Sequence, residues 1–182
     1  MIRNIRSPET GQLYMRRTYL WGAPYMLDGS SPFDAYGAVR EDAARTLGTQ
    51  CFKHKIVTSD FRGAIHNHPW EWGTSLILWG GYIEERFFKS FKDAAQFMLT
   101  HETIDLSGYG DKAPPIGWIV RHRVRAGNVV RLDGTTFHRV DLVDGGPAHT
   151  LFLAGPIRSG WGWGFLEPSG RFIPEREYLR AV

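Results

Sequence analysis

Short runs of apolar, β-branched and aromatic residues, separated by turns that contain Gly or Pro, dominate the chain. Runs of this kind, bounded by turn residues, are typical of β-strands. They predict strands over residues 13–21, 51–58, 64–68, 73–79, 82–88, 118–126, 128–132, 137–143 and 149–154. Many short strands at close spacing predict an all-β fold, an antiparallel sandwich or barrel with one or two short helices.

Two segments follow a helical period instead. Apolar residues recur every three or four positions over residues 33–47 and again over 90–100, which predicts two helices. The second helix lies in residues 89–116, whose Gly and Pro residues break the rhythm of the strands, and we interpret this stretch as an insertion. Residues 1–12 are expected to be irregular. We expect one domain over residues 1–182, with a barrel core over about 13–166.

The composition is that of a folded globular chain, and its small net charge is compatible with a small anionic substrate as partner. Hydrophobic residues make up 42% of the chain and charged residues 23%, which argues against disorder. The single cysteine, Cys51, excludes an intramolecular disulfide and is compatible with a reducing cytoplasm. No apolar run is long enough for a signal segment or a membrane span, so we expect a cytoplasmic protein without a membrane partner. A net charge of +3 does not indicate nucleic-acid binding.

Two histidines, His66 and His68, are separated by one residue. In a strand such residues point to the same face, about 6.5–7 Å apart along the strand, so both imidazoles can bind one metal ion. A third histidine, His138, follows a Gly, a short run and a turn, which would place it opposite the pair. Glu71 is a candidate for a further ligand or a base, and the alternative is a carboxylate at the rim.

These residues resemble the two motifs of the cupin superfamily. The first cupin motif has a Gly, then His-x-His, a Glu and a closing Gly, and the second is Gly-x5-Pro-x-Gly-x2-His. The matching residues are His66, His68 and Gly80 in the first motif and Gly127 and His138 in the second. The resemblance implies a double-stranded β-helix, or jelly-roll barrel, with a three-histidine metal site inside. Cupins often pair, so it also implies a homodimer.

This chain departs from the cupin motifs at several positions. Gly73 stands where cupins have the Glu, and Glu71 comes two residues earlier. Asp133 stands where cupins often have Pro, and Thr135 where they often have Gly. A narrower resemblance, to small cupin-like proteins of bacteria and bacteriophages, is carried by residues 66–70, 80–85 and 155–161.

The ligand set suggests a chemistry. Three neutral imidazoles leave a divalent ion with its full charge and about three open positions, which suits Fe(II). Mn, Ni, Co, Cu and Zn are alternatives. Such an ion could bind a substrate and O2 together, so we predict a dioxygenase-like Fe(II) oxygenase that acts on a small polar or anionic molecule. A metal-assisted isomerase or epimerase and a non-catalytic small-molecule-binding protein are the alternatives.

Further residues are candidates for binding the substrate. Two arginines could hold a carboxylate or phosphate through paired hydrogen bonds, and aromatic residues and one histidine could line the pocket. These candidates are Arg131, Arg139, Trp79, Tyr82 and His54. Along residues 73–79, alternation would place Trp79 on the inner face with Gly73. The remaining histidines, His101, His122 and His149, are expected to be structural or exposed.

Overall fold

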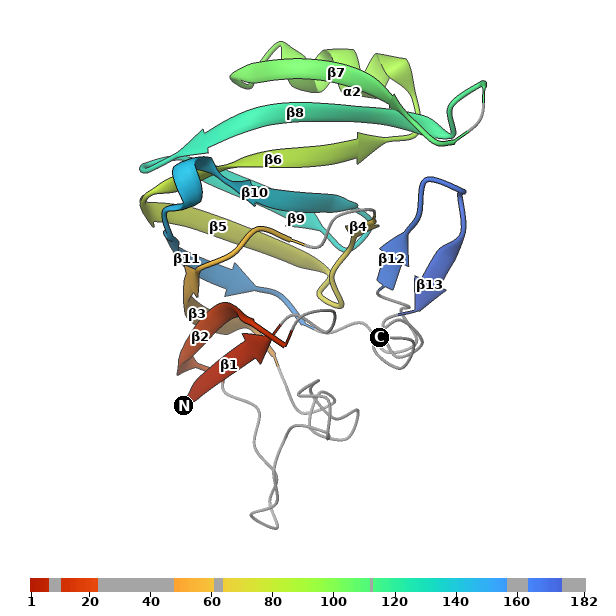
Figure 1. The fold of residues 1–182 in the computed structure, drawn as a ribbon. Coiled ribbons are helices and arrows are strands. Elements are labelled where there is room, and N and C mark those ends of the chain that lie inside the picture. Colours follow the sequence, from red (N-terminus) through yellow and green to blue (C-terminus); the bar gives the residue numbers. More distant parts are fainter. Residues whose placement is uncertain (7–10, 23–47, 61–63, 112, 157–163, 175–182) are drawn as a thin grey trace.

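The computed structural model describes residues 1–6, 11–22, 48–60, 64–111, 113–156 and 164–174 (Figure 1). Within them the chain forms two antiparallel sheets, one short α-helix and one 3-10 turn, η1 (Val143–Gly145). The fold class predicted from the sequence is therefore confirmed. The helix expected over residues 33–47 lies outside the described residues. Among the helices that the structure describes, none is long and apolar enough to cross a membrane.

The chain passes back and forth between the two sheets, as in a jelly roll. The six-stranded sheet has the order β1 (Ile2–Arg6), β2 (Leu13–Trp21), β3 (Gln50–Ile56), β11 (Ala148–Ala154), β5 (Trp72–Trp79) and β9 (Val129–Asp133). The seven-stranded sheet has the order β13 (Phe172–Pro174), β12 (Gly164–Leu166), β4 (Ile65–His66), β10 (His138–Leu142), β6 (Gly81–Phe88), β8 (Gly117–Arg125) and β7 (Thr103–Tyr109). Non-consecutive strands are thus neighbours, and residues far apart in sequence meet between the sheets.

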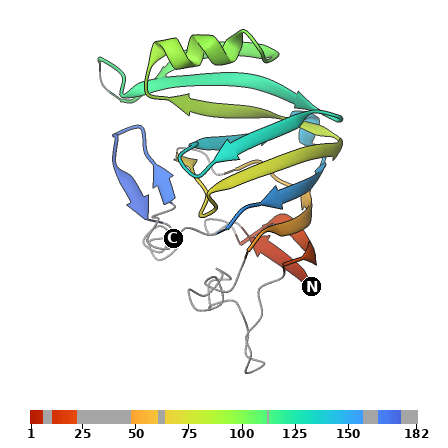
Figure 2. The same cartoon turned by 180° about the vertical axis from the view of Figure 1, so that it is seen from behind.

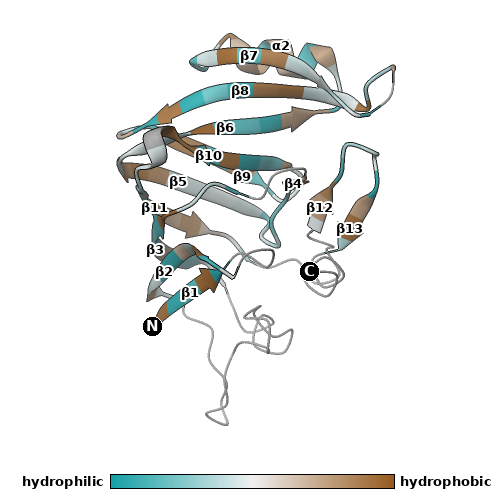
Figure 3. Ribbon diagram, in the orientation of Figure 1, coloured by the Kyte–Doolittle hydropathy of each residue, from teal (hydrophilic) through white to brown (hydrophobic). Residues whose placement is uncertain are grey.

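The core lies between the sheets and follows the alternation of the strands. Phe52 and Ile77 from the six-stranded sheet pack in one buried cluster with Tyr82 and Val124 from the seven-stranded sheet. Figure 3 shows hydrophobic and hydrophilic residues following one another along the strands. In β8, buried Val120, His122 and Val124 alternate with Arg121, Arg123 and Arg125. The inner faces therefore carry several polar residues within an apolar core.

Two segments differ from expectation. Residues 1–12 were expected to be irregular, but β1 pairs with β2. The stretch 89–116 contains, besides its predicted helix α2 (Phe91–Met98), the strand β7, which extends the sheet by pairing with β8. Both strands lie at sheet edges and are only partly buried, so their sequences lack a clear alternation. Figure 2 shows α2 lying along the far end of the seven-stranded sheet.

Gly73 leaves room for an aromatic ring in the core. A Cβ atom at this position would lie 2.5 Å from Cζ of Phe152, a ring that packs against Phe52 and Trp70. The Phe152 ring thus occupies the space that a side chain at position 73 would need.

We expect Gly73→Ala to lower the free energy of unfolding by about 1–3 kcal/mol, because the added methyl group overpacks the core. Urea denaturation measures this change. Gly48→Ala is the matched control, since a Cβ atom there meets nothing within 4 Å. Equal stability of the two variants would contradict the packing argument.

Candidate metal centre

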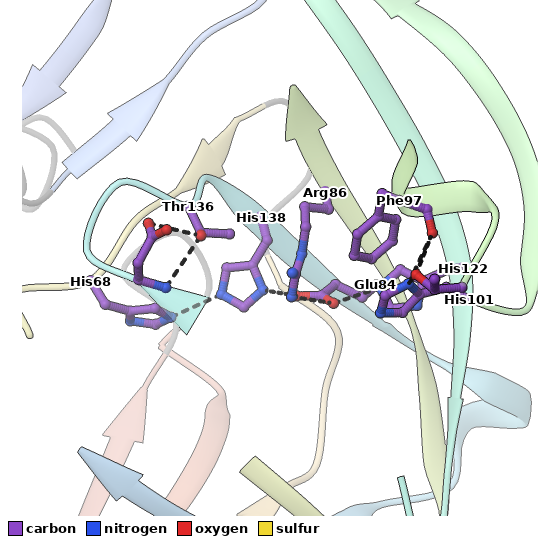
Figure 4. Close-up of polar contacts among 10 residues, drawn as sticks. His68, Glu84, Arg86, Phe97, His101, His122, Thr136 and His138 are labelled. Atoms are coloured by element: carbon purple, nitrogen blue, oxygen red, sulfur yellow. Dashed lines mark hydrogen bonds and ion pairs between the residues drawn. The ribbon is translucent and has the colours of Figure 1, made fainter. Parts of the chain in front are cut away.

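Three histidines converge where β4 meets β10. His66 on β4 is the direct antiparallel partner of His138 on β10, so both side chains point to the same face of the sheet. His68 follows two residues later. One ring nitrogen from each histidine lies within 4.8 Å of the other two. Figure 4 shows His68 and His138 pointing toward each other. These are the three residues that the motifs predicted as ligands.

The donor atoms fit a divalent transition metal. Nε2 of His68 lies 2.8 Å from Nε2 of His138. Two nitrogens bonded to one metal ion at about 2.1 Å and at a right angle would lie about 3.0 Å apart. Burial lowers the pKa of His66 to about 4, and burial followed by the charge of His138 lowers the pKa of His68 well below its ordinary value. These two imidazoles are therefore neutral at pH 7 and have lone pairs to donate.

A buried glutamate orients His138. Glu84 on β6 is 1% exposed, and its Oε1 lies 2.6 Å from Nδ1 of His138. Its other oxygen lies 2.6 Å from Nε2 of His122, and Nη2 of Arg86 donates to both oxygens at 3.0 and 3.1 Å. Figure 4 shows this row of side chains running from His68 to His122.

The charge of Glu84 decides which nitrogen of His138 is free. Burial raises the pKa of Glu84, but the Arg86 guanidinium and the hydrogen bonds from His122 and His138 hold it well below its ordinary value. An ionised carboxylate only accepts hydrogen bonds, so Nδ1 of His138 donates and Nε2 keeps its lone pair for the site. Carboxylates that fix a ligating histidine in this way are a regular part of metal sites.

Asn67, between the two histidines of the pair, anchors the segment that carries them. It is 2% exposed, and its Nδ2 donates to the carbonyl of Gly134 at 3.2 Å. Its Oδ1 accepts from the backbone N–H of Gly164 at 2.8 Å. The His66–His68 segment is thus tied both to the turn before His138 and to β12.

Asp60 supports the site from the side of His66. Its carboxylate accepts the backbone N–H of Val140 at 2.6 Å and lies 4.0 Å from Nδ1 of His66. Asp60 and Glu84 were both missed by the sequence analysis. For Glu84 a signal existed, because it shares strand parity with Tyr82, which we had placed in the pocket. For Asp60 we find no signal, because it lies in a turn with no periodic pattern.

Glu71, predicted as a ligand or base, lies at an exposed position. Its backbone N–H donates to the carbonyl of Pro156, and its carbonyl accepts from Gly134. Among the described residues, the group of potential ligands comprises the three histidines without Glu71. A role for Glu71 in the reaction stays a prediction.

The predicted substrate-binding residues differ in their burial. His54 and Tyr82 are buried on the inner faces, 5% and 4% exposed. Arg139 forms an ion pair with Glu85 at 2.6 Å. Trp79 is 63% exposed, because a register shift between β5 and β11 interrupts the alternation that would place it inside. Arg131 is also exposed.

The basic face of β8 is paired with acidic residues. Arg121 lies 3.3 Å from Glu85 and 3.4 Å from Asp105. Arg125 lies 2.5 Å from Glu102, which is also 3.9 Å from Arg123. Much of the positive charge of this strand is therefore neutralised locally.

No protein-family model matches the chain, and no curated protein matches it significantly. Its structure is similar to that of KdgF from Halomonas sp., with 12% identity over 79% of this chain and 82% of that one and a TM-score of 0.40. It is similar to oxalate oxidase in complex with the substrate analogue glycolate, with 13% identity over 62% of this chain and 44% of that one and a TM-score of 0.38. It is also similar to ectoine synthase from P. lautus, with 8% identity over 86% of this chain and 71% of that one and a TM-score of 0.40.

The chain spans under half the length of the oxalate oxidase chain that it matches. TM-scores below 0.5 do not assign a function, so the assignment rests on the chain's own residues. Its two antiparallel sheets and converging histidines are features that the cupin resemblance implies. The chain is a β-rich protein whose three histidines could hold a metal ion.

Proposed function

We propose that this protein is a metal-dependent enzyme, an Fe(II) oxygenase that acts on a small polar or anionic molecule. The observation that carries the proposal is the convergence of His66, His68 and His138 within 4.8 Å, with His138 fixed by buried Glu84. These histidines would hold the ion. When bound, the ion would supply a Lewis acid and open positions for substrate and O2. Mn, Ni and Zn are the alternative metals.

The chain's own residues prepare the site. Glu84 keeps the proton of His138 on Nδ1, so that Nε2 faces the site. The indole of Trp70 stacks on the ring of His68, with 5.1 Å between centroids and 27° between planes, and Trp70 is 7% exposed. This stacking fixes the orientation of His68 and shields one side of it from water. Glu71 remains the proposed base.

We expect protein purified without chelators to contain close to one transition metal per chain, with iron as the metal that supports turnover. Elemental analysis measures the metal, and an oxygen electrode measures O2 uptake with candidate small organic acids. Absence of metal, with no binding of added Fe(II) or Mn(II), would overturn the proposal.

Two further outcomes separate the alternatives. Turnover without O2 uptake would assign the protein to metal-assisted isomerases or epimerases. Ligand binding at the metal without turnover of the bound ligand would identify a non-catalytic binding protein.

A further inference from the structure

A polar row crosses the inner face of the six-stranded sheet. Arg17 on β2 is the direct partner of His54 on β3, which is the direct partner of Thr150 on β11. Direct partners in an antiparallel sheet point to the same face. His54 is 5% exposed and Thr150 2%, so this face is the inner one. Arg17 is half-buried, so solvent still reaches it.

Arg17 is held in a fixed position by its neighbours. Its Nε donates to Nε2 of His54 at 3.0 Å. Its Cζ lies 4.6 Å from the ring centroid of Phe52 and 5.4 Å from that of Trp70, so the guanidinium interacts with both ring faces. The two Nη groups are oriented as a consequence, because the guanidinium is planar.

The charge of Arg17 has no carboxylate partner within the part of the chain that the structure describes. The ion pairs recorded there involve other arginines, among them Arg86 with Glu84 and Arg139 with Glu85. A partly buried charge is costly unless it is paired. The Nη donors of Arg17 are therefore suited to an anion that enters from outside the chain.

Arg17 lies beside the candidate metal centre. Trp70 contacts both the Arg17 guanidinium and the ring of His68. The cation and the candidate metal ligand thus contact the same aromatic side chain.

The charges of the site favour a negative ligand. A divalent ion on three neutral imidazoles would keep its full charge, and Arg17 would add another. The buried carboxylate of Glu84 is already engaged by Arg86 and two histidines. The carboxylate of Asp60, 4.0 Å from Nδ1 of His66, offsets one positive charge, and the divalent ion and Arg17 together carry more than that. An anion that reaches both the ion and Arg17 would balance this excess.

We infer that Arg17 is the residue that binds the substrate's anionic group, and that the substrate is a small organic acid. The two Nη groups of Arg17 would hold the carboxylate of this acid. A second oxygen of the acid would reach the ion that His68 helps to hold. The inference rests on the proposed metal site and adds the class of substrate. It assigns to Arg17 the role that the sequence analysis gave to Arg131 and Arg139.

The test uses the full chain loaded with Ni(II), and malonate as the probe. Calorimetry is expected to show malonate binding, weakened about 30-fold or more by Arg17→Gln, because a charged partner is removed from a partly buried pair. Arg16→Gln is the matched control, since the exposed Arg16 lies on the other face of β2. It should leave malonate affinity unchanged, and both variants should still bind Ni(II).

A second comparison keeps the test valid if Arg17→Gln fails to fold. The wild-type protein should bind malonamide, the uncharged analogue, at least as poorly as Arg17→Gln binds malonate. Phosphate should bind more weakly than malonate, and tighter phosphate binding would overturn the assignment to organic acids.

The failure of the inference and the failure of the metal site give different results. If the wild-type protein does not bind Ni(II), the proposed metal site is wrong. The role of Arg17 is wrong, and the metal site stands, if Ni(II) binds but malonate does not. The same conclusion follows if malonate binds equally well to the wild-type protein and to the two variants, Arg17→Gln and Arg16→Gln.

Discussion

Replacing Glu84 with alanine is expected to lower the free energy of unfolding by about 3–5 kcal/mol, as for other broken buried charge networks. The substitution leaves the Arg86 side chain, 12% exposed, without its carboxylate partner. It also removes the hydrogen-bond acceptor of His122 and of His138, both of which are buried. Urea denaturation of the metal-free protein measures the loss, so the result does not depend on metal binding.

Glu102→Ala is the matched control for this prediction. Glu102 also pairs with arginines, but its side chain is 54% exposed, and exposed ion pairs are typically worth about 0–1 kcal/mol. If Glu84→Ala costs no more than Glu102→Ala, the buried network does not stabilise the fold.

The charge of Glu84 also predicts how the free energy of unfolding changes with pH. Its pKa in the folded protein is held below the ordinary value of 4.5, so its stabilising effect is complete above that value. The effect is lost as the pH falls through the pKa of the folded state. Glu84→Gln should therefore lose less stability than the wild-type protein between pH 5 and the acid transition, which is measured by the same denaturation at several pH values.

His138→Ala is expected to weaken metal binding by more than about 100-fold, beyond the cost of losing a residue that only orients a ligand. His138 supplies one of three donor nitrogens, and it is the ligand that Glu84 orients. Titration with Ni(II) against a competing chelator measures the affinity. Glu84→Gln, which leaves all three donors in place, should weaken binding by about 10–100-fold.

His149→Ala is the control for the loss of a histidine. His149 lies on β11, next to Trp79 and away from the triad. Metal affinity unchanged in His138→Ala, or equally reduced in His149→Ala, would contradict the triad as the metal site.

The strands and the ligand group were accessible from the sequence because each follows a local rule. Apolar and aromatic runs between turn residues located β5, β6 and β8, and the spacing of His66 and His68 required only a common face. Glu84 was harder, because Glu84 and Glu85 are adjacent and only the parity with Tyr82 distinguishes the inner one. The structure pairs Glu84 with buried histidines and Glu85 with Arg139.

Other features depend on contacts between distant residues, which a single sequence does not reveal. The sequence does not show why residue 73 is a glycine, because the ring that fills the space beside it, Phe152, comes from another strand. Arg17 was not singled out in the sequence. Its position over Phe52 and Trp70 arises from the pairing of β2 with β3 and the packing of the sheets.

The hydrogen bonds of Asn67 bear on when the site can form during synthesis. Its side-chain partner Gly164 lies 97 residues further along the chain. A growing chain that has passed His138 but not yet reached Gly164 contains all three histidines without this anchor on the segment that carries two of them. The ribosome therefore makes the ligands before it makes the residue that secures them, and stable metal loading should follow, rather than precede, the emergence of β12.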